Sequence, residues 1–276
     1  MGREETGKTD QNTKKRKGRP ALAAAMVICI GVMIFCAIQI FNILAEDQKG
    51  NSEYKELSQY GVSEEWANSY KAEKAETAGE PADELTAPDI DWDALKEKNP
   101  DVIGWITVPG TVINYPIVKG EDNDKYLHYT FENVKNANGS IFLDYRCSGE
   151  LSDSLNVIYG HNMKRGAMFH DLEKFKEEKF FDEHREILIF TPEQAVRLKV
   201  VAAFAEDPKK VTFHFGQMEE TEFTQYYEDY VTDQCDFALD MPEGTRQLYT
   251  FMTCSYEFGN ARTFVQAVPW DIGAEY

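Results

Sequence analysis

The stretch RQLYTFMTCSYEFGNARTFV, residues 246–265, contains two strand patterns and the short connection that decide the fold. From Leu248 to Cys254 every second side chain would lie on one face of an extended strand, because side chains alternate along β-structure. The pattern breaks after Cys254 and resumes at Ala261. Two antiparallel strands joined by so short a connection would bring Arg262 close to Cys254. We therefore expect a thiol and a guanidinium side by side at the end of a strand pair.

Short runs of the same β-rich kind recur along the chain, separated by turn residues. The expected strands are 104–108, 111–118, 140–145, 156–159, 186–190, 196–205, 246–253 and 261–268. Helical patterns are confined to 91–98, 123–129, 167–175 and 219–231. Parallel βαβ crossovers need a dozen or more residues each, and most of these connections are too short for a helical crossover. We predict a mainly β fold, a closed eight-stranded barrel with a few peripheral helices.

An uncharged apolar run, ALAAAMVICIGVMIFCAIQIFNILA, occupies residues 21–45. A helix of about 20 apolar residues crosses the hydrocarbon core of a bilayer. Basic residues cluster before the run and acidic residues follow it, which favours a cytoplasmic N-terminus and an extracellular body. We predict a single-pass signal anchor in the cell membrane, preceded by a basic cytoplasmic tail at 1–20. A cleaved signal peptide is disfavoured, because the run is long and Ile43-Leu44-Ala45 is a poor cleavage site.

Residues 46–88 are rich in Glu, Lys, Ala and Ser and carry only scattered apolar side chains. This composition is typical of an extracellular stalk or linker, with short helices at most. The amino-acid pattern changes at residue 89. After it, Asp91 can cap a helix that ends at Asn99-Pro100. We therefore expect the folded domain at 89–276.

The charge of the chain is segregated. The formal net charge is −19, yet the first 20 residues hold seven basic against three acidic side chains, so the remainder is more acidic still. Nucleic-acid binding needs a surplus of Lys and Arg for the phosphates, which excludes that class of function. The sequence also contains no metal-ligand spacing and no Gly-rich phosphate loop. We expect neither a metal nor another cofactor.

Three cysteines lie outside the apolar run, at Cys147, Cys235 and Cys254. An odd number in an exported domain leaves at least one thiol unpaired, either buried and inert or reactive. The sequence does not decide whether Cys147 and Cys235 form a disulfide. The domain is long enough to bury a core without disulfides.

A second polar residue follows a strand in NVIYGHNM, residues 156–163, where Gly160 ends the strand and His161 comes next. Strands distant in sequence can end at one rim of a barrel, so a sequence separation of 93 positions does not keep His161 and Cys254 apart. A His beside a Cys is the arrangement that activates a thiol nucleophile. Taken alone each residue is weak evidence, since a single His is more often structural and an exported Cys is often inert.

The flanks of these residues resemble the sortase family, and class B in particular. The similarity covers residues from about 90 to 268. It rests on YGHNM with Met168-Phe169, Thr-Cys254 with Arg262 eight residues later, DVIGWI at 101–106, INYPIV at 113–118, Asp122-Asn with Tyr126-Leu127, and GSIFLDYR at 139–146. The resemblance implies an eight-stranded sortase barrel, a helix in the long connection before the Cys strand, and a catalytic His161, Cys254 and Arg262.

The resemblance also implies a reaction and its partners. Cys254 would cleave the C-terminal sorting signal of a secreted protein through a thioester, in a Gram-positive-type envelope. The amine of a peptidoglycan precursor or a pilin would then take the acyl group. Residues beside the catalytic ones are expected to bind the substrate: Asn162, Met163, Met252, Thr253 and Ser255.

Two departures from the family pattern bear on the site. The usual Thr-Leu-x-Thr-Cys reads Thr250-Phe-Met-Thr-Cys254, which alters the expected pocket lining. An acidic residue often seen before the Arg strand is replaced by Gly259-Asn260-Ala261, so no carboxylate is assigned to orient His161. The other histidines match no catalytic position and are interpreted as structural: His128, His170, His184 and His214.

Two other classes of function stay open. A cell-wall cysteine peptidase would use the same Cys and His chemistry but hydrolyse its substrate. In papain-like peptidases the Cys precedes the His along the chain, whereas here His161 comes first, which favours the sortase interpretation. The non-enzymatic alternative is an anchored binding ectodomain in which Cys254 is merely buried.

Overall fold

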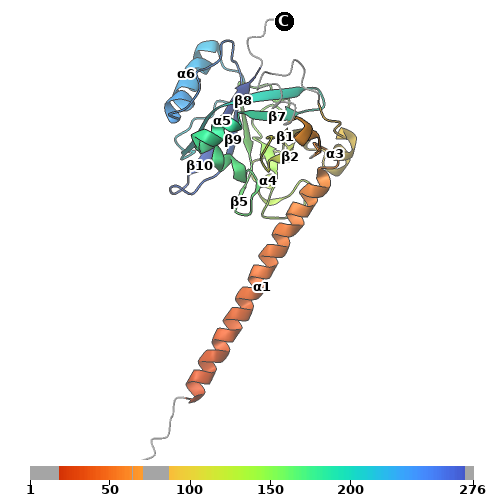
Figure 1. Cartoon of the computed structure of the whole chain (residues 1–276), viewed down its shortest axis with the longest axis vertical. Helices are drawn as coiled ribbons and strands as arrows, with labels where there is room; N and C mark the ends of the chain where they lie inside the picture. The colour runs from red at the N-terminus through yellow and green to blue at the C-terminus, as the bar shows by residue number, and fades with distance from the viewer. Residues whose placement is uncertain (1–18, 64, 71–86, 271–276) are drawn as a thin grey trace, which may run out of the picture. The chain divides into compact units, whose positions relative to one another are not determined.

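The computed structural model describes residues 19–63, 65–70 and 87–270. The predicted basic tail up to residue 18, residues 71–86 of the predicted stalk and the last six residues lie outside the described residues. The chain forms two compact units, Met1–Ala45 and Glu46–Tyr276. Helix α1, Arg19–Leu57, begins in the first unit and ends in the second (Figure 1). From Leu22 onward this helix is long and apolar enough, by length and composition, to cross a membrane.

Eight strands of the second unit close a barrel in the order β1-β2-β3-β4-β9-β10-β8-β7. Their bounds are β1 (Val102–Thr107), β2 (Asn114–Val118), β3 (Ile141–Leu143), β4 (Leu155–Tyr159), β7 (Glu186–Phe190), β8 (Ala195–Glu206), β9 (Leu248–Cys254) and β10 (Arg262–Pro269). The pairs β2–β3 and β4–β9 run parallel, and the other neighbours are antiparallel. The predicted closed eight-stranded barrel is confirmed.

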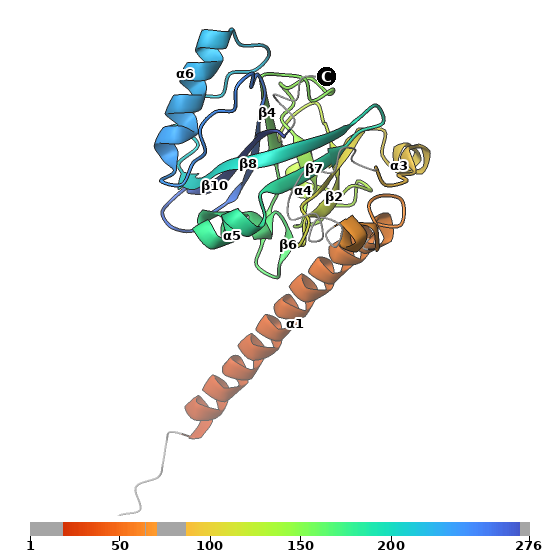
Figure 2. The same cartoon turned by 45° about the horizontal axis from the view of Figure 1, so that its top comes forward.

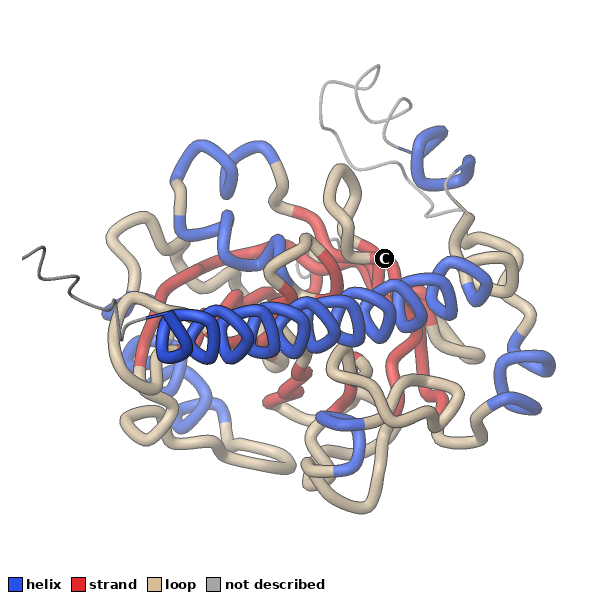
Figure 3. Tube along the Cα trace, turned by 90° about the horizontal axis from the view of Figure 1, so that it is seen from below, coloured by secondary structure: helices blue, strands red, loops and turns tan. Residues whose placement is uncertain are grey.

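Short helices lie around the barrel, as the colouring by secondary structure shows (Figure 3). They include α3 (Trp92–Lys98), α4 (Lys125–His128), the 3-10 helix η1 (His170–Lys176), α5 (Glu178–Glu183), α6 (Glu220–Tyr230) and the 3-10 turn η2 (Thr232–Gln234). Helix α3 begins as predicted, because the Asp91 carboxylate accepts a hydrogen bond from the Ala94 N–H at 2.9 Å.

Helix α6 lies on the outside of the barrel (Figure 2). An aromatic stripe on one side of the helix packs it against the barrel. Phe223, Tyr226 and Tyr227 are buried in one apolar cluster with Leu248 and Phe264, which belong to β9 and β10.

The predicted helix at 167–175 is only partly helical. Ala167–Met168 form strand β6, which pairs with β5 (Asn162–Met163) in a small hairpin, and η1 begins at His170. Met168 has a φ of +57° and Gly166 a φ of +80°. A right-handed helix needs negative φ at every residue, so no helix can start before this hairpin has closed.

Part of the segment expected to be a stalk is built into the barrel domain. Tyr54, Leu57, Val62 and Tyr70 are buried in its main apolar core. The ring of Tyr54 packs edge-on against Tyr115 at 5.3 Å, and its hydroxyl donates to the Gly139 carbonyl at 2.5 Å. The few apolar residues of this segment therefore form a buried face, although charged neighbours separate them in the sequence.

We expect Tyr54→Phe to lower the free energy of unfolding by about 1 to 3 kcal/mol, because the ring is kept while buried polar groups lose a partner. These groups are the Gly139 carbonyl and the Phe131 N–H, which donates to the Tyr54 hydroxyl at 3.2 Å. Denaturant unfolding of a fragment covering residues 46–276 measures the change. Tyr256→Phe is the matched control, since Tyr256 is 66% exposed, and should shift stability by less than about 0.5 kcal/mol. Equal stability of the Tyr54 variant would contradict the placement of this helix end in the domain.

Candidate active site

Cys254 and Arg262 lie directly opposite each other in the sheet. Strand β9 ends at Cys254, strand β10 begins at Arg262, and the antiparallel register pairs these two residues. The connection turns back at Asn260, whose φ of +64° suits Asn better than most side chains. The predicted proximity of the thiol and the guanidinium is confirmed.

His161 reaches the same region from strand β4. The strand ends at Tyr159, and Gly160 then permits a close turn: a Cβ at Gly160 would lie 2.4 Å from the Ile141 side chain and 2.7 Å from Phe169. The Nε2 atom of His161 is 2.8 Å from the Leu127 carbonyl. A carbonyl oxygen only accepts hydrogen bonds, so Nε2 carries the proton and Nδ1 is the ring atom left to exchange one.

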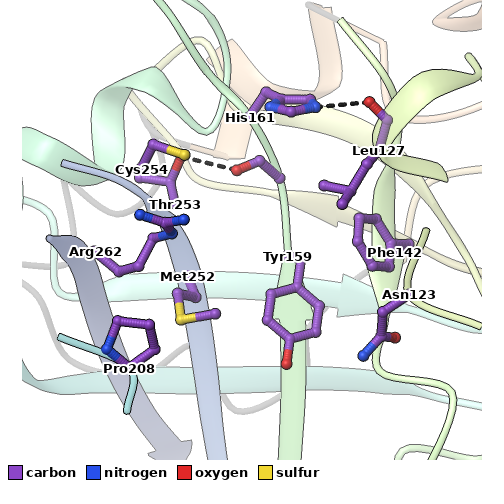
Figure 4. A pocket seen from close by; sticks show the side chains of 11 residues that line it. Asn123, Leu127, Phe142, Tyr159, His161, Pro208, Met252, Thr253, Cys254 and Arg262 are labelled. Carbon is purple, nitrogen blue, oxygen red and sulfur yellow. Dashed lines mark hydrogen bonds between the residues drawn. The ribbon is translucent and has the colours of Figure 1, made fainter. Parts of the chain in front are cut away.

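One cavity of about 310 Å³ collects the three predicted catalytic residues. Figure 4 shows the Cys254 thiol, the His161 ring and the Arg262 guanidinium around the same space. The lining residues are Asn123, Leu127, Phe142, Tyr159, Gly160, His161, Pro208, Met252, Thr253, Cys254 and Arg262. Aliphatic, aromatic and thioether side chains make up much of the wall, which suits an extended peptide whose reacting bond must be shielded from water.

Hydrogen bonds hold the end of β4 to the end of β9. The Gly160 N–H donates to the Met252 carbonyl at 3.2 Å, and the Thr253 hydroxyl donates back to the Gly160 carbonyl at 2.8 Å. The side-chain amide of Asn162 donates to the Cys254 carbonyl at 2.9 Å. The backbone around His161 is therefore fixed to the backbone around Cys254 by three bonds.

Arg262 keeps its charge available to the cavity. Its Nη1 donates to the Ala261 carbonyl at 2.9 Å, and no ion pair among the described residues includes it. A half-buried guanidinium with unused donors can bind a carbonyl oxygen or an oxyanion.

The residues expected to bind substrate are only partly at the cavity. Met252 and Thr253 line it, although the Thr253 hydroxyl is already engaged by Gly160. Asn162, Met163 and Ser255 are not among the lining residues. The Ser255 hydroxyl lies against Glu257 and accepts from Lys176 at 3.2 Å, while Asn162 holds the Cys254 carbonyl.

Six wall residues were not predicted as site residues: Asn123, Leu127, Phe142, Tyr159, Gly160 and Pro208. Asn123 and Tyr159 both donate to the buried Asp144 carboxylate at 2.8 Å.

The carboxylate of Asp144 also binds the Arg146 guanidinium through two donors. Burial alone would raise the pKa of Asp144, but these hydrogen bonds outweigh it and the pKa lies below its ordinary value. The Asp144 carboxylate, held by these hydrogen bonds, therefore fixes one wall of the cavity.

The other two cysteines of the domain, unlike Cys254, do not line the cavity. Cys147 and Cys235 are both unpaired, so the disulfide that the sequence left open is not formed. Cys147 is 3% exposed, and burial raises the pKa of its thiol to about 12. A thiol with so high a pKa is almost entirely protonated near neutral pH and is a poor nucleophile.

Comparison with known proteins places this geometry in a family. The sequence pattern of the sortase domain matches residues 106–270, which is more than half of the chain. The chain belongs to the sortase family. A curated sortase B from Listeria monocytogenes is 37% identical over 167 residues, covering 59% of this chain and 66% of that relative. Homologous sortases are cysteine transpeptidases, and the class B resemblance seen in the sequence is confirmed.

Solved structures agree with the assignment. Sortase B from Clostridium perfringens is 32% identical with a TM-score of 0.60, covering 65% of this chain and 99% of that one. Sortase B from Bacillus anthracis is 26% identical with a TM-score of 0.65, covering 82% of this chain and 98% of that one. The barrel of this sortase is thus the class B fold.

Proposed function

We propose that this chain is a membrane-anchored sortase that cleaves a sorting signal through a thioester on Cys254 and transfers the acyl group to an amine. The observation that carries the proposal is the cavity at which Cys254, His161 and Arg262 meet. Each residue comes from a different strand end, and each supplies one group that acyl transfer needs. Family membership supports the reaction class.

In the first step the Cys254 thiolate attacks the carbonyl carbon of a Thr-Gly-like or Thr-Asn-like peptide bond. The carbonyl oxygen becomes negative, and Arg262 donates hydrogen bonds to it. The carbon–nitrogen bond then breaks, and His161 as imidazolium gives its Nδ1 proton to the leaving amine. The products are a thioester on Cys254 and the released tail of the signal.

In the second step an amine attacks the thioester. Nδ1 of His161, now unprotonated, accepts the proton that the amine loses as the new amide bond forms. Cys254 leaves as the thiolate, and the starting charges of the site are restored. The Leu127 carbonyl holds the opposite ring atom throughout, so the imidazole keeps one orientation in both steps.

The apolar helix bears on where in the cell the reaction takes place. We propose that residues 21–45 span the cell membrane with the N-terminus in the cytoplasm, which leaves the catalytic unit in the envelope. The substrates of such an enzyme are secreted proteins with a C-terminal sorting signal. The acceptor is the amine of a peptidoglycan precursor or of a pilin, and lipid-linked precursors lie at the same membrane surface.

Mass spectrometry of the protein with sorting-signal peptides and amines tests the function. We expect a peptide-amine product and a transient thioester with the wild type, and neither product with Cys254→Ala. Cys147→Ala is the matched control and should keep most turnover, because the Cys147 thiol is buried with a pKa raised to about 12. Hydrolysed peptide without amine product would instead support the peptidase alternative, and no thioester at all would support a binding ectodomain.

Arg262→Lys tests the oxyanion role. The variant keeps a positive charge but loses the planar fork of donors, and the two residues are not interchangeable at such a site. Loss of one oxyanion donor typically costs about 2.7 to 4 kcal/mol, so transfer should fall roughly a hundredfold to a thousandfold. Arg246→Lys is the control. Arg246 forms an ion pair with Glu220 at an N–O distance of 2.9 Å, and it does not line the cavity. If the Arg262 variant stayed within about tenfold of wild type, charge alone would explain its role.

Membrane anchoring is tested by extraction. The full-length chain, tagged at its N-terminus, should stay with membranes in alkaline carbonate, whereas a variant lacking residues 21–45 should be released. Protease added outside intact cells should degrade the 46–276 unit and spare the tag. Recovery of mature protein without the tag would show a cleaved signal peptide.

A further inference from the structure

The hydrogen bond from Asn162 to Cys254 occupies a defined place in the sheet. Strands β4 and β9 are parallel, and their last backbone bond runs from the Gly160 N–H to the Met252 carbonyl. Bonds in a parallel ladder are evenly spaced, so the next one would join the N–H of residue 162 to the Cys254 carbonyl. The main chain of Asn162 instead pairs with Met168 in the β5–β6 hairpin. Its side-chain amide makes the missing bond, at 2.9 Å.

This substitution of a side chain for a backbone donor lets the chain turn at His161. If β4 continued straight, His161 would be an ordinary strand residue and its ring could not be directed by the turn. Because the Asn162 amide completes the ladder, the Cys254 carbonyl keeps a partner while His161 leaves the sheet for the cavity. One side chain thus joins the turn that carries the acid–base residue to the strand end that carries the thiol.

His170 determines how the Asn162 amide is oriented. The Asn162 Oδ1 atom lies 2.8 Å from His170 Nδ1. The amide nitrogen must face the Cys254 carbonyl, because only the nitrogen can donate. The amide oxygen therefore faces His170, and His170 Nδ1 carries a proton. Reversing the amide would place two acceptors together at the Cys254 carbonyl.

We propose that Asn162 and His170 are positioning residues that fix the backbone of the nucleophile, and that Asn162 does not bind substrate. The inference rests on the proposed acyl transfer for its kinetic consequence, but the hydrogen-bond relay itself is independent of the substrate. The relay runs from His170 through Asn162 to Cys254, and neither Asn162 nor His170 lines the cavity. His170, interpreted from the sequence as structural, thereby acts on the reaction through two hydrogen bonds.

Three substitutions separate the bonds of the relay. Asn162→Asp keeps an oxygen toward His170 but replaces the donor to Cys254 with a second acceptor. His170→Asn keeps a donor at the position of Nδ1, whereas His170→Leu removes it. The full-length chain in detergent is assayed with the most active peptide of the sorting-signal panel and hydroxylamine as the amine. The rate at which methyl methanethiosulfonate modifies Cys254 is measured in parallel, with thermal unfolding to verify folding.

We expect Asn162→Asp to lower kcat by roughly fivefold to tenfold, the effect of losing about one hydrogen bond, while KM stays within about twofold. His170→Leu should lower kcat by about threefold, and His170→Asn should restore it to near the wild-type value. The modification rate of Cys254 should fall most in Asn162→Asp, less in His170→Leu and hardly at all in His170→Asn. His170→Leu should add nothing in the Asn162→Asp background, because the relay is already broken. His214→Leu is the matched control, since His214 makes a similar ring bond to Glu222 at 3.1 Å on helix α6, and should behave as wild type.

Three results would overturn the proposal. A raised KM with unchanged kcat in Asn162→Asp would make Asn162 a substrate contact. Fully additive effects of the two substitutions would show that His170 does not act through Asn162. Failure of His170→Asn to recover would show that the ring itself matters, not the donor. Absence of transfer in the wild type would count against the proposed function only, because the modification rates of Cys254 still report on the relay.

Discussion

The parallel pairing of β4 with β9 is the contact on which the active site depends. It joins strands whose paired residues are far apart in sequence, with Tyr159 opposite Met252, and it brings the two strand ends to the same rim of the barrel. The antiparallel pairing of β9 with β10 then needs only a short turn to place Arg262 opposite Cys254. Once these two registers are set, all three polar groups face one cavity without any long loop having to carry them.

Parallel neighbouring strands require a long connection. The connection between β4 and β9 also contains other elements of the fold. These include β7 and β8, which close the barrel, and helix α6, which covers its outer face. A one-residue slip of β4 against β9 would turn Tyr159 away from the cavity while Met252 stayed in place, since side chains alternate along strands. The apolar burial beneath α6 opposes such a slip, because Leu155 and Val157 of β4 pack in the same cluster as Leu248 of β9.

Strand periodicity was enough to predict the barrel and the meeting of Cys254 with Arg262, because local alternation and a short turn decide both. The resemblance supplied His161, whose approach depends on a pairing between distant strands that no local pattern reveals. Asn162 was predicted to contact substrate from its position beside His161, and local sequence gave no sign that its amide would bind the Cys254 carbonyl. Pro208 was missed because it enters the cavity wall from the loop after β8, where the sequence carries no signal.

The end of helix α1 shows why composition misled the prediction of a stalk. A stalk needs a solvated surface, yet Tyr54 places its hydroxyl 2.5 Å from the Gly139 carbonyl. Gly139 has a φ of +55°, and a Cβ there would lie 3.0 Å from the His161 ring and 3.1 Å from the Leu127 carbonyl. That carbonyl accepts the His161 Nε2 proton. The helix end therefore supports the loop that orients the His161 imidazole, so a fragment cut at residue 89 would lose the Tyr54 hydroxyl that binds this loop.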